Sequence, residues 1–464
     1  MSESPSGNPH TRGIAQFVST LSFDAIPAEV RHRIKLLMLD AIGCGLYAAE
    51  LEWSRILQRT LGAVDSTRAC TVWGSGQKLS APHAVLVNGS QVQGFELDDV
   101  HKVGVLHTGC LVVPPLIALA EMRPGMSGRE FLAAAVAGYE IGPRVGICMG
   151  SEHIAQGWHS GATVGVFASA AAASRAMKLD AEKTVHALGI AGTQSCGLMA
   201  AQFGSMVKRM HAGRAAQSGL YAAQLADAGF TGIVNVFESE YGGFCTTFSR
   251  SNDRFKLAAL TAGFGSVWQT MNVALKFYSC VGSNHSTLDS ICELQASHPF
   301  NAKDVEKIVV HASEVTVSHV GWKYVAQGFT AAQLNLSYCV ATLLIDGEVF
   351  VDQFTADKLA DPARMTLADK VSVVHDPAIT ARGPKFRQMV RVEVFLKDGM
   401  RLERTREASR AKESFAPDEM VVKKFETLAS HVLPAGQMHE IADAVLGIEK
   451  LTDASLFGRL LKRA

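Results

Sequence analysis

Residues 160–178 contain a run of small apolar side chains, and this run constrains the fold more than any other segment. It reads Gly161-Ala-Thr-Val-Gly-Val-Phe-Ala-Ser-Ala-Ala-Ala-Ala-Ser and is apolar on nearly every side. A helix that is apolar all round is buried in a protein core. Because the side chains are also short, we expect a buried helix that other helices approach closely.

Other stretches on both sides of this run place apolar residues at helical spacing. Pro27 fits the first turn of one such helix, and Asp180 fits the acidic N-cap of another. The segments with a helical pattern are residues 27–42, 129–148, 180–184, 213–228 and 417–464. The chain is therefore predicted to be mostly helical from about residue 14 to 270, and again near its C-terminus.

The pattern changes to strands after about residue 270. Lys307-Ile-Val-Val-His-Ala is typical of a strand, and residues 389–396 alternate apolar and polar side chains. Asp398-Gly399 then predicts the turn of a hairpin whose second strand begins at Arg401.

These patterns predict a mainly α protein with two domains. A chain of 464 residues is too long for one ordinary core. We expect a large all-helical domain built from residues 1–270 and 409–464. A smaller α+β lid domain is expected to be inserted at residues 271–408.

Composition excludes several classes of partner. The formal net charge is zero, so no overall field attracts nucleic acid or an anionic membrane. The nine cysteines form no CxxC pair, which favours a reducing compartment. The first ten residues are polar, so we expect no signal peptide, and no run of about 20 apolar residues predicts a membrane span. We expect a cytoplasmic protein.

The segment from Gly94 to Cys110 is the first candidate site, because it places many ionisable side chains just before a strongly apolar stretch. Buried charges are costly unless they are paired. The candidate residues are Glu96, Asp98, Asp99, His101, Lys102 and His107. A solvated loop with an acidic helix end remains an alternative. A metal site at Asp98, Asp99 and His101 is a second one, although no second ligand motif supports it.

Two further clusters carry chemistry-bearing side chains. His159 precedes the small-residue run, where the positive end of a helix dipole favours the neutral imidazole that a general base needs. Lys208, Arg209, His211 and Arg214 lie within seven residues and suit carboxylate binding. A structural histidine and an exposed basic turn remain the alternatives. Segments 276–285, ending in His285, and 336–341, with Tyr338, are weaker candidates.

The sequence lacks the motifs of several large enzyme classes. It has no GxGxxG opening a helix after a strand, no phosphate-binding P-loop and no GxSxG elbow. Nicotinamide, nucleotide and acyl-serine chemistry therefore have no support.

Taken together, the clusters resemble the MmgE/PrpD family, which contains 2-methylcitrate dehydratases, cis-aconitate decarboxylases and iminodisuccinate epimerases. The resemblance covers about residues 30–450. Its landmarks are Leu39-Asp-Ala-Ile-Gly, Val87-Asn-Gly, Glu96-Leu-Asp-Asp-Val-His, Gly138-Tyr-Glu-Ile, Gly157-Trp-His, Gly189-Ile-Ala-Gly, Met206-Val-Lys-Arg-Met-His-Ala-Gly-Arg-Ala-Ala, Gly229-Phe-Thr-Gly and Leu344-Ile-Asp-Gly.

The resemblance implies a homodimer with no metal or organic cofactor and an active site between the two domains. It also implies that catalytic side chains fall on His107, His159, Lys208, His285 and Tyr338. The residues expected to bind substrate are Asp98, Asp99, His101, Lys102, Arg209 and His211.

The family's reactions share a proton transfer at a carbon next to a carboxylate, which needs a base, a proton donor and cations. We therefore expect a cofactor-independent lyase, a dehydratase or decarboxylase, acting on a small di- or tricarboxylate. His159 would be the base and Lys208 the acid. An isomerase or epimerase of a dicarboxylate such as iminodisuccinate remains an alternative, as does a non-catalytic binding protein on the same fold.

Overall fold

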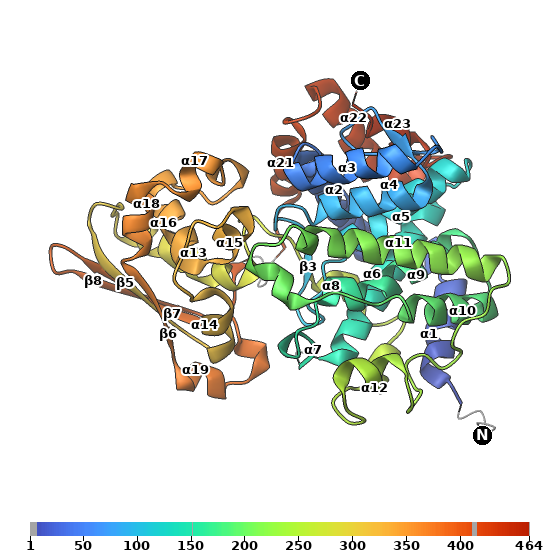
Figure 1. Cartoon of the computed structure of the whole chain (residues 1–464), viewed down its shortest axis with the longest axis horizontal. Helices are drawn as coiled ribbons and strands as arrows, with labels where there is room; N and C mark the ends of the chain where they lie inside the picture. Colours follow the sequence, from blue (N-terminus) through green and yellow to red (C-terminus); the bar gives the residue numbers. More distant parts are fainter. Residues whose placement is uncertain (1–6, 151, 411–414, 464) are drawn as a thin grey trace.

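A computed structural model gives the fold, and it describes residues 7–150, 152–410 and 415–463. Helices from both ends of the chain gather on one side, and the elements between them, which include the largest sheet, lie on the other (Figure 1). The protein is thus mainly α, as predicted. The domain boundaries and the action of the smaller part as a lid stay predictions. The predicted absence of a signal peptide rests partly on residues 1–6, which lie outside the described residues.

The first group of elements is helical. Its helices are α1 (Pro9–Thr20), α2 (Ala28–Ala48), α3 (Glu52–Val64), α4 (Ala81–Val92), α5 (Gly109–Met122), α6 (Gly128–Met149), α7 (Glu152–Ala155), α8 (Ser160–Thr163), α9 (Gly165–Ala176), α10 (Ala181–Gly192), α11 (Val207–Asp227), α12 (Phe244–Ser249), α21 (Asp418–Ala429), α22 (Ala435–Leu446) and α23 (Leu456–Leu460).

Local sequence signals explain where several of these helices begin. The Asp180 side chain accepts a hydrogen bond from the Lys183 amide (2.8 Å) and caps α10 as predicted. Ser127 and Glu130 form a reciprocal capping box at the start of α6. The expected helix at residues 213–228 begins earlier, at Val207, so the basic cluster lies on the first turns of α11 and is not an exposed turn.

The second group contains a four-stranded sheet and shorter helices. The sheet order is β6-β5-β7-β8, with β6 parallel to β5 and the other neighbours antiparallel. The predicted strand and hairpin are confirmed as β5, β7 and β8, whereas β6 had not been predicted. The elements are α13 (Gly282–Ser297), β5 (Val305–Ala312), α14 (Glu314–Val320), α15 (Phe329–Leu334), α16 (Leu336–Asp346), α17 (Ala356–Leu359), α18 (Pro362–Ala368), β6 (Val371–His375), α19 (Pro377–Ala381), β7 (Val390–Leu396) and β8 (Arg401–Arg406).

Two short ladders complete the fold. β1 (Cys70–Thr71) pairs with β2 (Lys78–Leu79) inside the helical group. β3 (Val100–His101) pairs with β4 (Val273–Ala274) and so joins the first candidate segment to the chain that leads into α13.

The small-residue run forms α8 and α9, and α9 is buried among helices as expected. A Cβ on Gly219 of α11 would lie 2.5 Å from the Ala170 backbone nitrogen of α9. One on Gly138 of α6 would lie 2.9 Å from the Ala168 carbonyl oxygen. These contacts require glycine, because a methyl group at such distances displaces backbone.

We expect Gly219→Ala to lower the free energy of unfolding by about 1–3 kcal/mol, the usual cost of overpacking a core. Urea denaturation monitored by circular dichroism measures it. Gly436→Ala is the matched control, because a Cβ on Gly436 in α22 meets no atom within 4 Å. The control should be neutral or stabilising by up to about 1 kcal/mol. Equal destabilisation by both variants would contradict the close-packing account.

Within the described ranges, α6 is the one helix long and apolar enough to cross a membrane. It is covered by other helices, and 94% of its most apolar window is buried inside the protein. Core helices of this kind pass the same test of length and composition, so α6 is best explained as the middle of the helical group.

Candidate functional site

A cavity of about 560 Å³ receives side chains from both groups of elements. The helical group contributes α8, α11 and the segment around residues 96–107, and the second group contributes α13, α14 and the chain before β7 (Figure 1). The polar and charged residues in its wall are Glu96, His107, His159, Ser160, Gln202, Lys208, Lys276, Ser283, Glu314, Ser318, His319, Arg387 and Gln388.

Glu96 is the anchor of the charged groups in this cavity. Its carboxylate forms ion pairs with Lys208, with Arg209 (2.9 Å) and with Lys276 (3.5 Å), and all four side chains are buried. Burial raises the pKa of Glu96, but the three cations outweigh it and hold that pKa well below its usual range. Glu96 is therefore an ionised carboxylate that holds several cations in place.

The backbone at this segment adopts conformations that side-chain-bearing residues rarely take. Glu96 has φ of 58° and Val105 has φ of 47°, and both line the cavity. Left-handed backbone costs roughly 1–3 kcal/mol per residue and occurs often at functional sites. The surrounding contacts must therefore stabilise this loop, and its shape places Glu96 and His107 at the cavity.

A buried lysine outside the cavity holds the same loop from behind. Lys424 of α21 donates to the carbonyl oxygens of Leu97 and Lys276, each at 2.7 Å, and pairs with Asp40 of α2 at 2.5 Å. Three separate parts of the chain are thereby tied together directly behind the site.

Three histidines predicted from the sequence come together at this cavity. His107 and His159 line it, and the Nδ1 atom of His159 lies 3.1 Å from Nδ1 of His211 on α11. His107 Nδ1 lies 3.2 Å from Oδ2 of Asp98. The sequence thus identified a set of side chains that the fold brings to one place.

The His159 imidazole has a pKa well below the ordinary value, as predicted, but for another reason. Burial is the main cause, followed by the positive charge of Lys208 and by the neighbouring His211 ring. The helix that follows His159 is α8, which has only four residues, so its dipole was not a sound basis for the prediction. His211 also has a lowered pKa because of burial and Lys208.

Lys208 has the properties of an acid. Its pKa is lowered from the usual value because burial disfavours the charged form, although Glu96 acts in the opposite direction. A lysine with a lowered pKa gives up a proton more readily than a solvated one. It lines the cavity close enough to His159 for its charge to lower the pKa of that ring.

Several residues predicted to bind substrate are occupied elsewhere. Arg209 is buried and bonds Glu96, Thr330 and Gln333, so it is an anchor behind the wall. The Asp99 carboxylate accepts hydrogen bonds from the amides of Thr108 and Gly109 and from Tyr139. It therefore fixes the start of α5, next to His107. Burial and the neighbouring Asp98 charge raise the pKa of Asp99 to about 6.

His101 and Lys102 also lie away from the cavity wall. The His101 ring bonds Gln269 (3.1 Å) and the Gly104 amide (2.8 Å), and Lys102 lies 5.9 Å from the centre of the Phe415 ring. Asp98, Asp99 and His101 therefore have different partners and do not form the metal site considered from the sequence. Across the described residues, no group of three or more His, Cys, Asp or Glu side chains is placed to hold a metal ion.

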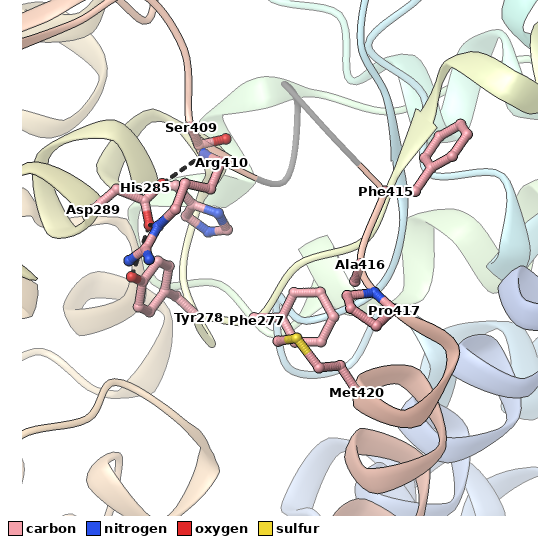
Figure 2. A pocket seen from close by; sticks show the side chains of 10 residues that line it. All are labelled: Phe277, Tyr278, His285, Asp289, Ser409, Arg410, Phe415, Ala416, Pro417 and Met420. Carbon is pink, nitrogen blue, oxygen red and sulfur yellow. Dashed lines mark hydrogen bonds and ion pairs between the residues drawn. The ribbon is translucent and has the colours of Figure 1, made fainter. Parts of the chain in front are cut away.

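His285 and Tyr338 are not in this cavity. His285 lines a different hollow of about 350 Å³ beside Tyr278, Asp289 and Arg410 (Figure 2). Its Nε2 atom lies 3.1 Å from the Cys280 carbonyl oxygen. The Tyr338 hydroxyl donates to the Lys358 carbonyl oxygen (3.3 Å) in the interior of the second group. The geometry gives no support to a catalytic role for either.

Sequence reasoning missed part of the wall that the second group contributes. Ser283, His319, Arg387 and Gln388 line the cavity, and Ser283 Oγ lies 3.2 Å from His319 Nδ1. Burial and the charge of Arg387 lower the pKa of His319 to about 4. Lys276, Glu96 and Ser283 lay within segments singled out earlier but had been given no role. The other residues stand in short segments without a recognisable motif.

Comparisons with known proteins identify the family of the chain. The MmgE/PrpD N-terminal domain matches residues 12–256, and the MmgE/PrpD C-terminal domain matches residues 278–448. The chain is 35% identical to a cis-aconitate decarboxylase-like protein of Aspergillus oryzae, over 97% of this chain and 96% of that protein. It is also 35% identical to cis-aconitate decarboxylase of Aspergillus terreus (97% and 95%) and 26% identical to the human protein of that name (97% and 94%).

Both family domains match in order and cover most of the chain, and the relatives align along nearly their whole length. The chain therefore belongs to the MmgE/PrpD family of enzymes.

Proposed function

We propose that this protein is a lyase that decarboxylates a small tricarboxylate of the cis-aconitate type. The observation that carries the proposal is the pairing, in one cavity, of a proton-donating lysine and a neutral histidine with fixed cations. Lys208 and His159 both line the cavity, and Lys208 is held by Glu96. The names of the relatives at 35% identity support this choice among the family's reactions.

The charge balance in the cavity wall favours an anionic substrate. Lys208, Lys276 and Arg387 are cations in this wall, and they face two carboxylates, that of Glu96 and that of the exposed Glu314. The surplus positive charge lies in a partly desolvated site, where it attracts a carboxylate more strongly than it would in water. A polycarboxylate is the ligand that such a cavity accepts best.

Decarboxylation needs stabilisation of negative charge and delivery of one proton. The bond to the departing carboxylate breaks, carbon dioxide leaves, and its electron pair moves into the unsaturated carbon skeleton. A proton must then reach carbon, and we assign Lys208 as its donor. Lys276 is placed to stabilise the negative charge that develops before the proton arrives.

Dehydration is the second candidate, and the neutral state of His159 favours it. Dehydration and epimerisation both begin with removal of a proton, which a neutral imidazole can accept. The lowered pKa of His159, caused mainly by burial, keeps the ring in that form. His107, beside Asp98, would then assist the leaving hydroxyl.

A substrate screen in deuterated water tests the proposal. The panel is cis-aconitate, 2-methylcitrate, citrate and iminodisuccinate. We expect carbon dioxide from cis-aconitate and one deuterium on carbon in its product. Formation of an alkene from a hydroxy acid, without release of carbon dioxide, would identify a dehydratase. Exchange of deuterium into a substrate whose formula is otherwise unchanged would identify an isomerase. Absence of turnover on the whole panel would favour a binding protein.

The pH profile of the reaction should reflect the lowered pKa of His159. If neutral His159 is required, activity persists as the pH falls through 6.5, the ordinary histidine value, and declines only at lower pH. We therefore expect the acid limb of kcat/KM to lie below pH 6.5. Circular dichroism over the same range controls for unfolding. An acid limb at or above pH 6.5 would contradict the assignment.

We further propose that the enzyme needs no metal or organic cofactor, because every proton transfer above is assigned to a side chain. Dialysis against a chelator should leave the rate unchanged, and loss of activity that added metal restores would overturn this. We also propose a cytoplasmic homodimer. Within the described residues the nine cysteines are free, which suits a reducing compartment, and light scattering tests the dimer.

A further inference from the structure

The chain just before β7 brings two polar side chains into the cavity wall. Arg387 and Gln388 both line the cavity and come from the second group of elements, whereas Lys208 comes from α11 of the first. Neither residue belongs to a cluster that the sequence singled out. Both side chains have polar atoms without a hydrogen-bond partner among the described residues.

The backbone of Arg387 is fixed by hydrogen bonds, whereas its guanidinium has no carboxylate partner among the described residues. Its carbonyl oxygen accepts hydrogen bonds from the hydroxyls of Ser313 (2.7 Å) and Thr316 (2.6 Å), at the start of α14. Over the described part of the chain, no hydrogen bond or ion pair of its guanidinium is found. The side chain is half-buried, and burial lowers its pKa with no neighbouring carboxylate to oppose the effect.

Arginines with a supporting role in this protein have partners. Arg144 donates to the carbonyl oxygens of Ala262 and Val267, Arg209 binds Glu96, and Arg364 binds Asp346. A half-buried guanidinium that faces a cavity without such partners carries an unsatisfied preference for an anion.

Gln388 provides a second, independent sign of a ligand at the same place. Its side chain is 7% exposed, and its Oε1 atom has no hydrogen-bond partner among the described residues. Its Nε2 atom lies beside Gly282, where a Cβ would be 3.5 Å away. The Oε1 atom can only accept, so the donor that a carboxylate needs is Nε2, for which no hydrogen bond is found among the described residues. Because Gly282 also lines the cavity, this amide donor lies at the cavity wall and is available to a bound group. Glu314, an acidic residue of the same wall, is exposed.

We infer that Arg387 and Gln388 form a second carboxylate-binding subsite, which selects substrates carrying a carboxylate in addition to the one held near Lys208. The inference rests on the proposed function, because it assigns the far carboxylate of the same substrate. Arg387 grips this group through paired N–H donors, and the Gln388 amide completes its hydrogen bonds. The subsite determines specificity and takes no part in proton transfer.

Binding of a non-reacting ligand tests the subsite without requiring turnover. The probes are propane-1,2,3-tricarboxylate and its shorter analogue butanoate, titrated by calorimetry into the full-length protein. Arg387→Gln should weaken binding of the tricarboxylate by about 30-fold or more, the usual loss when one partner of a desolvated charged pair is removed. Butanoate, with one carboxylate, should lose less than about 3-fold. Arg387→Lys keeps the positive charge but not the paired N–H donors of the guanidinium, so we expect it to recover tricarboxylate binding only in part.

Arg382→Gln is the matched control, because Arg382 lies on the same stretch but pairs with Glu407 at the surface. It should bind the tricarboxylate like the wild type. Arg387→Gln binding within 3-fold of the wild type would overturn the inference, as would equal losses for both probes. If Arg387→Gln fails to fold, as judged by thermal unfolding, Arg387→Met, which keeps an apolar stem and removes the charge, decides by the same criteria.

The outcomes separate this inference from the proposed reaction. Tight binding of the tricarboxylate that depends on Arg387, without carbon dioxide release from cis-aconitate, would support the subsite and contradict the proposed function. Decarboxylation of cis-aconitate, together with unchanged binding of the tricarboxylate by the Arg387 variants, would contradict the subsite but not the proposed function. A wild-type protein that does not bind the tricarboxylate at millimolar concentration overturns the subsite whatever the assay shows.

Discussion

Glu96→Gln should lower the free energy of unfolding by about 3–5 kcal/mol, the usual cost of removing one partner from a buried charge pair. Glu96 is 2% exposed and is the shared partner of Lys208, Arg209 and Lys276. Glutamine keeps the shape of the side chain but leaves three buried cations with one fewer negative charge. Repulsion among them should also displace Lys208, so activity should be lost as well.

Urea denaturation of the Glu96 variant measures the stability change. Glu306→Gln is the matched control, because Glu306 is an exposed residue of β5. The substitution therefore makes the same chemical change at the surface. It should shift the free energy by no more than about 0.5 kcal/mol. A loss below 1 kcal/mol for Glu96→Gln would show that the cations do not depend on this carboxylate.

Lys208→Met should reduce kcat by about 10²–10⁴-fold, the contribution typical of one acid–base group, with little loss of stability. Glu96 retains Arg209 and Lys276 when the ammonium is removed, so no unpaired buried charge remains. His159→Ala should lower kcat by a similar factor if the reaction begins with proton removal by His159, as in dehydration or epimerisation. Steady-state kinetics with the substrate identified in the screen measure both effects.

Lys423→Met is the control for the lysine, because Lys423 is an exposed residue of α21. Its turnover should equal that of the wild type. If Lys208→Met and His159→Ala both turn over within a few-fold of the wild type, the assignment of the proton-transfer pair is wrong. A large loss of stability in Lys208→Met would instead indicate a structural role.

Periodicity predicted most of the elements, because one face of each helix or strand must be buried. The small-residue run and the hairpin at Asp398-Gly399 carried the clearest signals, and both are confirmed. β6 escaped notice because Val371–His375 is a short strand with one fully buried residue. The start of α11 at Val207 was not predicted, because the charged residues on its first turns interrupt the apolar helical pattern.

The site was predicted in part, and its misses have a common physical cause. His107, His159 and Lys208 stand beside glycines and apolar runs that locate them, and they line one cavity. A sequence does not say which way a helix turns its side chains. Ser283 and His285 are two residues apart on α13, so they point about 200° from one another, and only Ser283 lines the cavity.

Arg387 shows a second limit of sequence reasoning. No motif surrounds it, and its position depends on hydroxyls from residues 313 and 316, which are distant in the chain. Only the packing of α14 against the chain before β7 places its guanidinium at the cavity. The proposed subsite at Arg387 could therefore be found only from tertiary contacts, whereas His159 and Lys208 could be singled out from their local sequence before the fold was known.

The tie made by Lys424 also bears on how the enzyme matures during synthesis. Every residue that lines the cavity precedes Lys424 in the chain, yet Lys424 binds the carbonyls of Leu97 and Lys276 that flank the charged loop. A nascent chain that has reached residue 400 thus carries all the cavity side chains without the group that fixes their loop. We expect the ribosome-bound protein to be inactive until α21 has emerged, so that catalytic activity reports translation past residue 429.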